Sequence, residues 1–462
     1  MNGAQAKMEV HEDLFPRLEE ARAITDRLFD VVKPEALYDR PIAERHRIVF
    51  YIGHLEAFDW NLFRGRAFAA EPFHPQFDRL FAFGIDPVGG GLPADQPSDW
   101  PRLEEIREYN RRLRQEIDSG LGGGRAGSAG AAKPGGAANG PNGSATEMPS
   151  RDLLLHVAAE HRLMHAETLA YMFHQLPLDH KFAKMFQASR PTPAVPVESL
   201  RPIEIPPGTA TLGLARGDRF GWDNEFMEHV TEVPGFTIDE YKVTNGEFLK
   251  FLREGGYQER SLWDDKAWQW ITSAGVRHPA FWSEPDGRDG HWFYRTMSAE
   301  IPLPAGWPVY VSHAEASAYA RWAGKRLPTE AEWHRAAYGA PHGPERDYPW
   351  GSDAPNARFG NFDSAQWDPT PVNAYPAGRS GYGVADLVGN GWEWTSTVFA
   401  PFPGFEPFSF YPGYSAGFFD GQHYVMKGAS ARTAACMLRP SFRNWFQPRY
   451  PFVYAGFRCV EN

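Results

Sequence analysis

Two histidines four residues apart are the residues of this chain best suited to hold a metal ion. His161 and His165 lie in the strongly helical stretch EHRLMHAETL, residues 160–169. Residues four apart share one face of an α-helix, so both imidazoles project in the same direction. With 16 histidines in 462 residues, chance alone gives about 0.55 such pairs (16 × 16/462). The pair therefore predicts a metal site only if the rest of the chain supplies a third ligand.

Composition restricts the classes of protein to which the chain can belong. Its 462 residues suffice for two or three domains, and 23% charged residues indicate an ordinary soluble protein. The net charge of −11 argues against nucleic acid or an anionic membrane as a partner. With only Cys436 and Cys459 there is no disulfide framework, and neither a signal peptide nor a run of 18 apolar residues is found. A cytoplasmic monomer is expected.

The elements that must position these histidines are long helices. Apolar residues recur every three or four positions in four segments, 12–32, 45–63, 101–117 and 149–177. Four long helices predict a bundle, and metal sites are often built in a bundle core from facing helices. Between the third and fourth helices, residues 120–149 are rich in glycine and alanine and predict a disordered loop.

The second half of the chain has a different character. Residues 190–208 are rich in proline and predict a stiff linker. Beyond them, short apolar runs alternate with turn residues, and one clear helix is expected in SHAEASAYARWAGK, capped by Ser312. The predicted fold class is α+β, with a helical bundle over residues 1–189, the linker, and a mixed α/β domain over residues 209–462.

Three passages of the second half carry a specific resemblance. They are YVSHAEASAYARWAGKRLPTEAEWHRAAYG (310–339), GYGVADLVGNGWEWTSTVF (381–399) and SFRNWFQPRYPFVYAGFRCV (441–460). In order and spacing they resemble the formylglycine-generating-enzyme-type domain, a variant of the C-type-lectin-like fold. Those enzymes bind copper through two nearby cysteines, and here Cys436 stands alone in that region, so the resemblance implies the fold without that activity. Asn390 and Glu393 match a place where relatives hold Ca²⁺, and a hydrogen-bonded turn is the alternative.

A helical bundle joined to such a domain resembles the non-haem iron sulfoxide synthases of ergothioneine biosynthesis, whose first domain is a DinB-like four-helix bundle. That family takes one iron-binding histidine from an early helix and two from an HxxxHxE motif on the fourth. His161 and His165 match this motif together with Glu167, and His54 in YIGHLEAFDWNLF matches the early ligand. The resemblance implies Fe(II) held by three histidines, with open positions for O₂, for the imidazole substrate hercynine and for an anionic chalcogen donor.

A structural or surface position is expected for several further charged residues and histidines. Glu56 and Asp59 either orient His54 or lie on the surface, and a surface position is expected. His156 and His174 fall off the face of the metal pair and are expected to be structural or exposed. Arg443 is expected to form a structural ion pair.

The resemblance also implies roles for residues of the second domain. Tyr411 and Tyr414 in FYPGYS match a tyrosine pair that faces the iron, and Tyr411 is expected to deliver a proton or hydrogen atom. The alternative is a pair of packing tyrosines in a turn. Asn444 and Trp445 in SFRNWFQP match residues that hold hercynine, whose quaternary ammonium suits aromatic faces.

Two departures from the family pattern concern the chalcogen donor. The common ergothioneine synthases resemble HEQQHQE at the metal helix, and Met164 here replaces the glutamine that precedes the second histidine. Synthases that use γ-glutamylcysteine have an acidic residue where this chain has Phe446. The family's arginine pair for the donor's carboxylates has only unaligned candidates here, Arg111, Arg112 and Arg114. A less charged donor is favoured, as in the selenoneine synthase branch, which uses a selenosugar.

Other functions stay open. An ergothioneine-type synthase that uses cysteine or γ-glutamylcysteine as the thiol donor is the first alternative. An ovothiol-type enzyme joins cysteine to histidine itself, but such proteins often carry a C-terminal methyltransferase, and only three residues follow GFRC here. A non-catalytic lectin-like binding protein is the third. His54, His161 and His165 discriminate an enzyme from the binding protein, because a binding module has no need of a three-histidine site.

Overall fold

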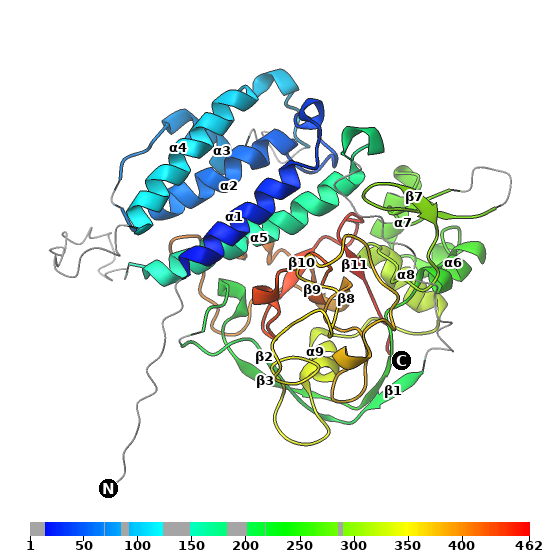
Figure 1. Cartoon of the computed structure of the whole chain (residues 1–462). Coiled ribbons are helices and arrows are strands. Elements are labelled where there is room, and N and C mark those ends of the chain that lie inside the picture. Colours follow the sequence, from blue (N-terminus) through cyan, green and yellow to red (C-terminus); the bar gives the residue numbers. More distant parts are fainter. Residues whose placement is uncertain are drawn as a thin grey trace, which may run out of the picture. The chain divides into compact units, whose positions relative to one another are not determined.

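The computed structural model describes residues 14–68, 70–84, 92–122, 148–182, 201–217, 219–284 and 290–462. Contacts within the chain define two compact units (Figure 1). The first consists of Met1–Asp30 and Leu37–His165, and the second of Val31–Ala36 and Ala166–Asn462. No helix among these described residues is long and apolar enough to cross a membrane. The predicted disordered loop 120–149 falls mostly on residues 123–147, which lie outside the described ranges.

The first unit is a helical bundle (Figure 1). Its long helices correspond to the four predicted ones and are α1 (Phe15–Phe29), α2 (Ile48–Phe63), α4 (Leu103–Gly122) and α5 (Arg151–Gln175). Their apolar faces form the core, in which the following side chains are at most 2% exposed: Leu18, Ile48, Leu55, Ile106, Leu113 and Leu155. Helix α5 extends beyond this unit, because residues from Ala166 onward belong to the second unit.

A short helix, α3 (Pro75–Phe83), has no counterpart in the sequence prediction. It begins at Pro75, a residue that favours the first helical turn, after His74 has capped the helix by accepting a hydrogen bond from the Phe77 N–H. Phe81 of α3 packs directly on Gly53 of α2, where a Cβ atom would collide with its ring. Gly53 therefore allows α3 to approach α2 closely, one residue before His54.

The second unit is built around a four-stranded sheet with the order β10-β9-β8-β11. Strand β8 (Gly391–Val398) pairs antiparallel with β9 (Tyr424–Ala429), β9 pairs antiparallel with β10 (Asn444–Phe446), and β11 (Ala455–Gly456) runs parallel to β8. Smaller sheets consist of β1 (Pro202–Ile205) with β4 (Phe236–Asp239), β2 (Gly208–Leu212) with β3 (His229–Val233), and β5 (Trp282–Ser283) with β6 (Phe293–Arg295) and β7 (Glu300–Pro302).

Strand β1 corrects the predicted linker. Residues 202–205 were expected to belong to the proline-rich connector 190–208, but they pair antiparallel with β4. The reason is burial, since Ile205 is 1% exposed and joins the core cluster of Ile238, Trp333 and Val460. The hydrophobic gain and the backbone pairing outweigh the local preference of a proline-rich segment. Residues 183–200 of the predicted linker lie outside the described ranges.

The prediction of one helix in the second half is wrong. The described residues contain α6 (Asn245–Arg253), α7 (Asp265–Ser273), α8 (His313–Trp322) and α9 (Glu330–Tyr338). Ser312 caps α8 as expected, by accepting a hydrogen bond from the Glu315 N–H. Thr244 and Thr329 cap α6 and α9 in the same way, each with a glutamate three residues later. This S/T-x-x-E pattern would have located both helices in the sequence.

The three family motifs meet at one buried ion pair. Arg458 of the GFRC motif donates from Nε to Glu393 Oε2 (2.6 Å) and from Nη2 to Glu393 Oε1 (2.8 Å). Glu393 belongs to GNGWEW, and its Oε2 also accepts a hydrogen bond from Trp333 Nε1 of GKRLPTEAEW (3.0 Å). All three side chains are fully buried. These motifs therefore build the core of the domain, and the predicted α+β class, a helical bundle followed by a domain of this type, is confirmed.

Lys181 provides a test of the packing in the second unit. Its side chain is 3% exposed, and within the described part of the chain its Nζ has no hydrogen-bond partner. Burial, with a smaller contribution from Arg295, lowers the pKa of Lys181 from 10.5 to about 7. Protonation therefore opposes folding fully below pH 7, and this penalty disappears as the pH rises toward 10.5.

Replacing Lys181 with methionine is expected to stabilise the protein at pH 6–7 by up to about 5 kcal/mol, since the pKa falls from 10.5 to about 7 and each tenfold change in proton affinity corresponds to about 1.4 kcal/mol. The difference from the wild type should shrink steadily up to pH 10. Urea unfolding at several pH values measures it, with Lys250→Met on the exposed side of α6 as the control. A difference that is independent of pH would contradict this account of Lys181.

Candidate metal centre

Three predicted ligands, His54 on α2 and His161 and His165 on α5, converge within the first unit. Each offers one ring nitrogen, and these three atoms lie within 4.8 Å of one another. The ring centroids are 5.4 Å apart for His54 and His161, 4.9 Å for His54 and His165, and 4.5 Å for His161 and His165. Over the described ranges of the chain, no other group of three or more His, Cys, Asp or Glu side chains has a geometry that could hold a metal ion.

The hydrogen bond of His54 identifies its ligand atom. Its Nδ1 lies 2.7 Å from the backbone oxygen of Phe81, on α3. Because a carbonyl oxygen only accepts, Nδ1 carries the proton, and Nε2 keeps the lone pair that a metal requires. Second partners of this kind fix the tautomer and the orientation of metal-binding histidines. The helix that the sequence did not predict therefore orients one of the three rings.

All three imidazoles are neutral, which is the form that binds a metal. Burial is the main cause, and it lowers the pKa of His54 to about 4 and the pKa values of His161 and His165 well below the ordinary value of 6.5. His161 is buried, and His54 and His165 are partly buried. Three neutral nitrogen donors fit a divalent transition-metal ion such as Fe(II).

Aromatic side chains of α2 hold the histidine rings in place. Phe58 stacks on His161 with centroids 3.5 Å apart and an interplanar angle of 10°. Phe50 stacks on His54 at 4.7 Å, and the ring of Tyr51 lies 5.7 Å from that of His165. Tight packing of this kind restricts each imidazole to one rotamer, so the ligand atoms are arranged before any metal binds.

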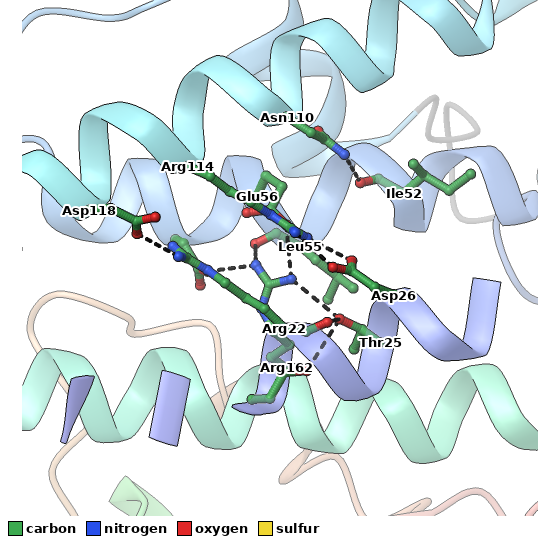
Figure 2. Close-up of polar contacts among 12 residues, drawn as sticks. Arg22, Thr25, Asp26, Ile52, Leu55, Glu56, Asn110, Arg114, Asp118 and Arg162 are labelled. Carbon is green, nitrogen blue, oxygen red and sulfur yellow. Dashed lines mark hydrogen bonds and ion pairs between the residues drawn. The ribbon is translucent and has the colours of Figure 1, made fainter. Parts of the chain in front are cut away.

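The expectation that Glu56 and Asp59 lie on the surface is wrong. Glu56 is 1% exposed and Asp59 is fully buried, and both pair with Arg162 of α5, which is itself 1% exposed. Figure 2 shows Arg162 and Glu56 within a network of polar contacts. Sequence reasoning missed Arg162, although a signal was present: it replaces the Glu of the HEQQHQE pattern, and α2 offers two acidic residues three positions apart.

The predicted tyrosines lie in an aromatic cluster of the second unit. The rings of Tyr411 and Tyr414 are 5.8 Å apart, and Trp445 lies 5.5 Å from Tyr414. Trp222, which the sequence did not single out, stacks on Tyr414 at 4.0 Å. Burial raises the pKa of Tyr411 to about 12, with a further contribution from the nearby carboxylate of Asp223. The Tyr411 hydroxyl therefore stays protonated at neutral pH.

Asn444 and Trp445, which the sequence prediction assigns to one substrate site, lie on opposite faces of strand β10. Asn444 and Phe446 project from one face of the strand and Trp445 from the other, because side chains alternate along a strand. The Oδ1 of Asn444 accepts a hydrogen bond from the Trp445 backbone N–H (2.9 Å). Phe446 stacks on Tyr450 with centroids 5.3 Å apart. Met164, the other predicted donor-binding residue, is partly buried in the first unit, on α5.

The three candidate arginines on α4, Arg111, Arg112 and Arg114, each have a partner within the protein. Arg111 pairs with Glu108 on the surface (2.7 Å), and Arg112 lies over the ring of Phe73 (4.9 Å to the centroid). Arg114 donates to both oxygens of Asp26 (2.7 Å each) and to Glu56 (2.6 Å and 2.8 Å), as Figure 2 shows.

Asn390 and Glu393 do not fit a calcium ion. Both oxygens of Glu393 accept hydrogen bonds from Arg458, and the Lys242 ammonium lies 3.3 Å from Oε1. The side chain of Asn390 bonds to the backbone N–H and C=O of Thr370. The positive charge that balances Glu393 therefore comes from the protein, and the alternative of a hydrogen-bonded turn describes this region.

The remaining predictions concern structural residues. His174 is buried, with Nδ1 3.2 Å from the Tyr454 hydroxyl and Nε2 2.5 Å from the Arg295 carbonyl oxygen. Arg443 forms the expected ion pair, with Glu330 (3.0 Å). Glu167 accepts hydrogen bonds from Trp392 Nε1 (2.7 Å), Ser430 Oγ (2.7 Å) and Thr433 Oγ1 (2.8 Å). The glutamate of the HxxxHxE motif thus anchors the second part of α5 within its own unit.

Comparisons with known proteins identify both halves of the chain. Residues 17–169 match the DinB superfamily, and residues 189–462, more than half of the chain, match the Sulfatase-modifying factor enzyme 1-like domain, FGE-sulfatase. Hercynine oxygenase of Mycolicibacterium thermoresistibile is 42% identical over 257 residues, which cover 54% of this chain and 56% of that protein.

Two further relatives extend this similarity. Ergothioneine biosynthesis protein 1 of Neurospora crassa is 27% identical over 93% of this chain and 55% of its own length. The formylglycine-generating enzyme of Mycobacterium tuberculosis is 30% identical over 44% of this chain and 76% of its own length. The chain spans between 55% and 60% of the first relatives that it matches.

The predicted resemblance to ergothioneine-biosynthesis proteins, with a DinB-like bundle and a formylglycine-generating-enzyme-type domain, is confirmed. The chain belongs to the FGE-sulfatase family of sulfatase-modifying factor enzyme 1-like domains, here preceded by a bundle of the DinB superfamily.

Proposed function

We propose that this chain is a non-haem Fe(II), O₂-dependent enzyme that forms a carbon–chalcogen bond at the imidazole C2 of hercynine. The observation that carries the proposal is the convergence of His54, His161 and His165 within 4.8 Å. The names of the relatives, hercynine oxygenase and ergothioneine biosynthesis protein 1, support the same substrate. A lectin-like binding protein would have no use for three neutral imidazoles around one point.

The three histidines would hold Fe(II) through neutral nitrogen atoms, so that the ion keeps its full 2+ charge. Iron bound there would supply the site for O₂ reduction and for an anionic donor. His54 would bind through Nε2, because its Nδ1 donates to the Phe81 carbonyl. The stacking of Phe50 and Phe58 on two of the rings would maintain this geometry throughout turnover.

The second unit supplies the groups proposed to act on the substrate. Tyr411 is proposed as the donor of a proton or hydrogen atom, with its hydroxyl kept neutral by burial. Tyr414 would hold the Tyr411 ring in position through its contacts with Trp222 and Trp445. Asn444 and Trp445 are proposed to bind hercynine, since an aromatic face attracts a quaternary ammonium. We expect the enzyme to act as a monomer.

A selenosugar is the donor that we propose. The support comes from the charges on α4, where Arg111, Arg112 and Arg114 already have protein partners. In addition, Met164 cannot donate a hydrogen bond to a carboxylate, and Phe446 cannot pair with an ammonium group. A sugar presents hydroxyl groups in place of these charges. Cysteine and γ-glutamylcysteine are the alternative donors, and they would make the protein an ergothioneine-type synthase.

The test offers the donors in parallel to the anaerobic, Fe(II)-loaded protein. Hercynine is mixed with a selenosugar, cysteine or γ-glutamylcysteine, air is admitted, and mass spectrometry identifies the adducts. A selenium adduct as the main product is expected. A sulfur adduct alone would replace the selenosugar proposal with ergothioneine-type synthesis. Absence of any adduct, together with absence of bound iron, would refute the enzyme and favour the binding protein.

A second variant makes the donor test sharper. The double substitution Met164→Gln and Phe446→Asp restores the residues that the γ-glutamylcysteine-dependent pattern has at these positions. If these positions set donor choice, the variant should gain sulfur adduct from γ-glutamylcysteine and lose selenium adduct. An unchanged ratio of the two products would show that Met164 and Phe446 do not determine the donor.

A further inference from the structure

We propose that Arg162 is a positioning residue, which fixes the register of α2 against α5 and so holds the three histidines at metal-binding distance. This inference rests on the proposed function only in assuming that the histidines bind a metal. Arg162 follows His161 directly in the sequence, yet its side chain points into the bundle and is 1% exposed. All the contacts that carry the inference lie within the first unit.

The guanidinium of Arg162 contacts α2 at three points beside a metal ligand. Its Nη2 donates to the backbone oxygen of Leu55 (2.9 Å) and to Asp59 Oδ2 (2.6 Å). Its Nη1 donates to Glu56 Oε1 (3.0 Å). Leu55 and Glu56 follow His54 directly. Arg162, which follows His161, is thus bonded to Leu55 and Glu56, which follow His54. A shift of either helix along the other would break these bonds.

An arginine suits this role because its donors form a rigid, planar fork. Two acceptors, Glu56 and Asp59, lie three residues apart on α2, and the backbone oxygen of Leu55 adds a point that no side-chain rotation can move. The three bonds therefore restrict both sliding and rotation of α2 relative to α5. Sliding by one residue would move His54 by about 1.5 Å along the helix axis, enough to break a metal–nitrogen bond.

A wider set of ion pairs includes Glu56, one of the acceptors of Arg162 (Figure 2). Arg114 of α4 donates to the same oxygen of Glu56 (2.6 Å) and bridges to Asp26 of α1 (2.7 Å). Arg22 of α1 donates to Asp118 of α4 (2.6 Å). If α5 shifted, the bonds of Arg114 would oppose a matching shift of Glu56. These ion pairs therefore link the positions of α1, α2, α4 and α5 to one another.

Stability alone does not explain this arrangement. A buried ion pair contributes little net stability compared with apolar side chains of the same volume, because its desolvation cost offsets its attraction. Charged groups add specificity of alignment, since their hydrogen bonds can all form in only one register of α2 against α5. A neutral, well-packed replacement should therefore keep the bundle folded and loosen the metal site.

The experiment measures binding of Co(II), used as a probe of the apo protein, by visible absorption. One variant, Arg162→Met with Glu56→Gln and Asp59→Asn, replaces Arg162 and its two carboxylate partners together, so that none of these three charges is left without its partner. The other is Arg162→Lys, whose single ammonium cannot reach all three acceptors. Arg102→Met removes an exposed arginine of a surface ion pair in the same unit and is the matched control.

Both variants are expected to fold, as judged by circular dichroism, and to bind Co(II) about 10–100-fold more weakly, with an altered visible spectrum. The control should match the wild type. Folded variants with the wild-type affinity and spectrum would overturn the positioning role. If the wild type itself bound no Co(II), the proposed function would fail and this inference with it, so the two failures are distinguishable.

Discussion

Substitution of His161 by alanine is expected to abolish stoichiometric iron binding and the formation of any hercynine adduct. The variant keeps two of three ligands and loses the ring that stacks on Phe58 at 3.5 Å. Loss of a residue that merely orients a ligand weakens metal binding by about 10–100-fold, so loss of a ligand itself should exceed that range. Metal analysis after anaerobic loading and desalting measures the effect.

The control for this prediction is His156→Ala. His156 also lies on α5 but does not belong to the cluster of His54, His161 and His165. Its removal should leave one iron per chain. Retention of one iron per chain by the His161 variant would instead mean that the metal binds elsewhere, and the assignment of the site would be wrong.

The second large effect is expected for Tyr411→Phe. If Tyr411 delivers a proton or hydrogen atom, its removal should lower kcat by about 10²–10⁴-fold, the contribution typical of a positioned proton donor. Phenylalanine keeps the ring beside Tyr414, 5.8 Å away, so the KM for hercynine should change little. Rapid-quench measurement of adduct formation separates the two parameters. Tyr414→Phe shows whether the neighbouring hydroxyl acts instead.

The pH dependence gives an independent check of Tyr411. Burial raises the pKa of Tyr411 to about 12, so the hydroxyl remains protonated up to pH 10 and loses its proton only at higher pH. Ionisation of Tyr411 should therefore cause no fall in kcat between pH 8 and pH 10. If Tyr411→Phe retained the wild-type kcat, the alternative of a packing tyrosine would stand.

The convergence of the three histidines could be predicted because helical spacing pairs His161 with His165 and the family resemblance adds His54. Helical periodicity places His161 and His165 on one face, and YIGHLEAFDWNLF supplies His54. What the sequence analysis did not predict is the hydrogen bond between His54 and Phe81, since Phe81 lies on α3, a helix of only nine residues. A contact between two segments 27 residues apart has no local signal.

Charged residues were the main source of error. Glu56 and Asp59 were expected at the surface because carboxylates are rarely buried unless they are paired. Their partner, Arg162, lies more than 100 residues away in the sequence, so its compensating charge could not be seen locally. In β10, strand alternation places Asn444 and Trp445 on opposite faces, which the sequence motif did not state. A motif names residues that are neighbours in the sequence without stating which way they point.

The anchoring of α5 has a consequence for how this protein can be divided into fragments. The family match begins at residue 189, and a fragment cut there would lack Glu167 and His174. The hydroxyls of Ser430 and Thr433 and the indole N–H of Trp392 would then lose their shared acceptor in the core, and such a fragment should aggregate. Helix α5 is divided between the two units at residue 165/166, so the start of the family match and the start of the compact unit differ by more than twenty residues.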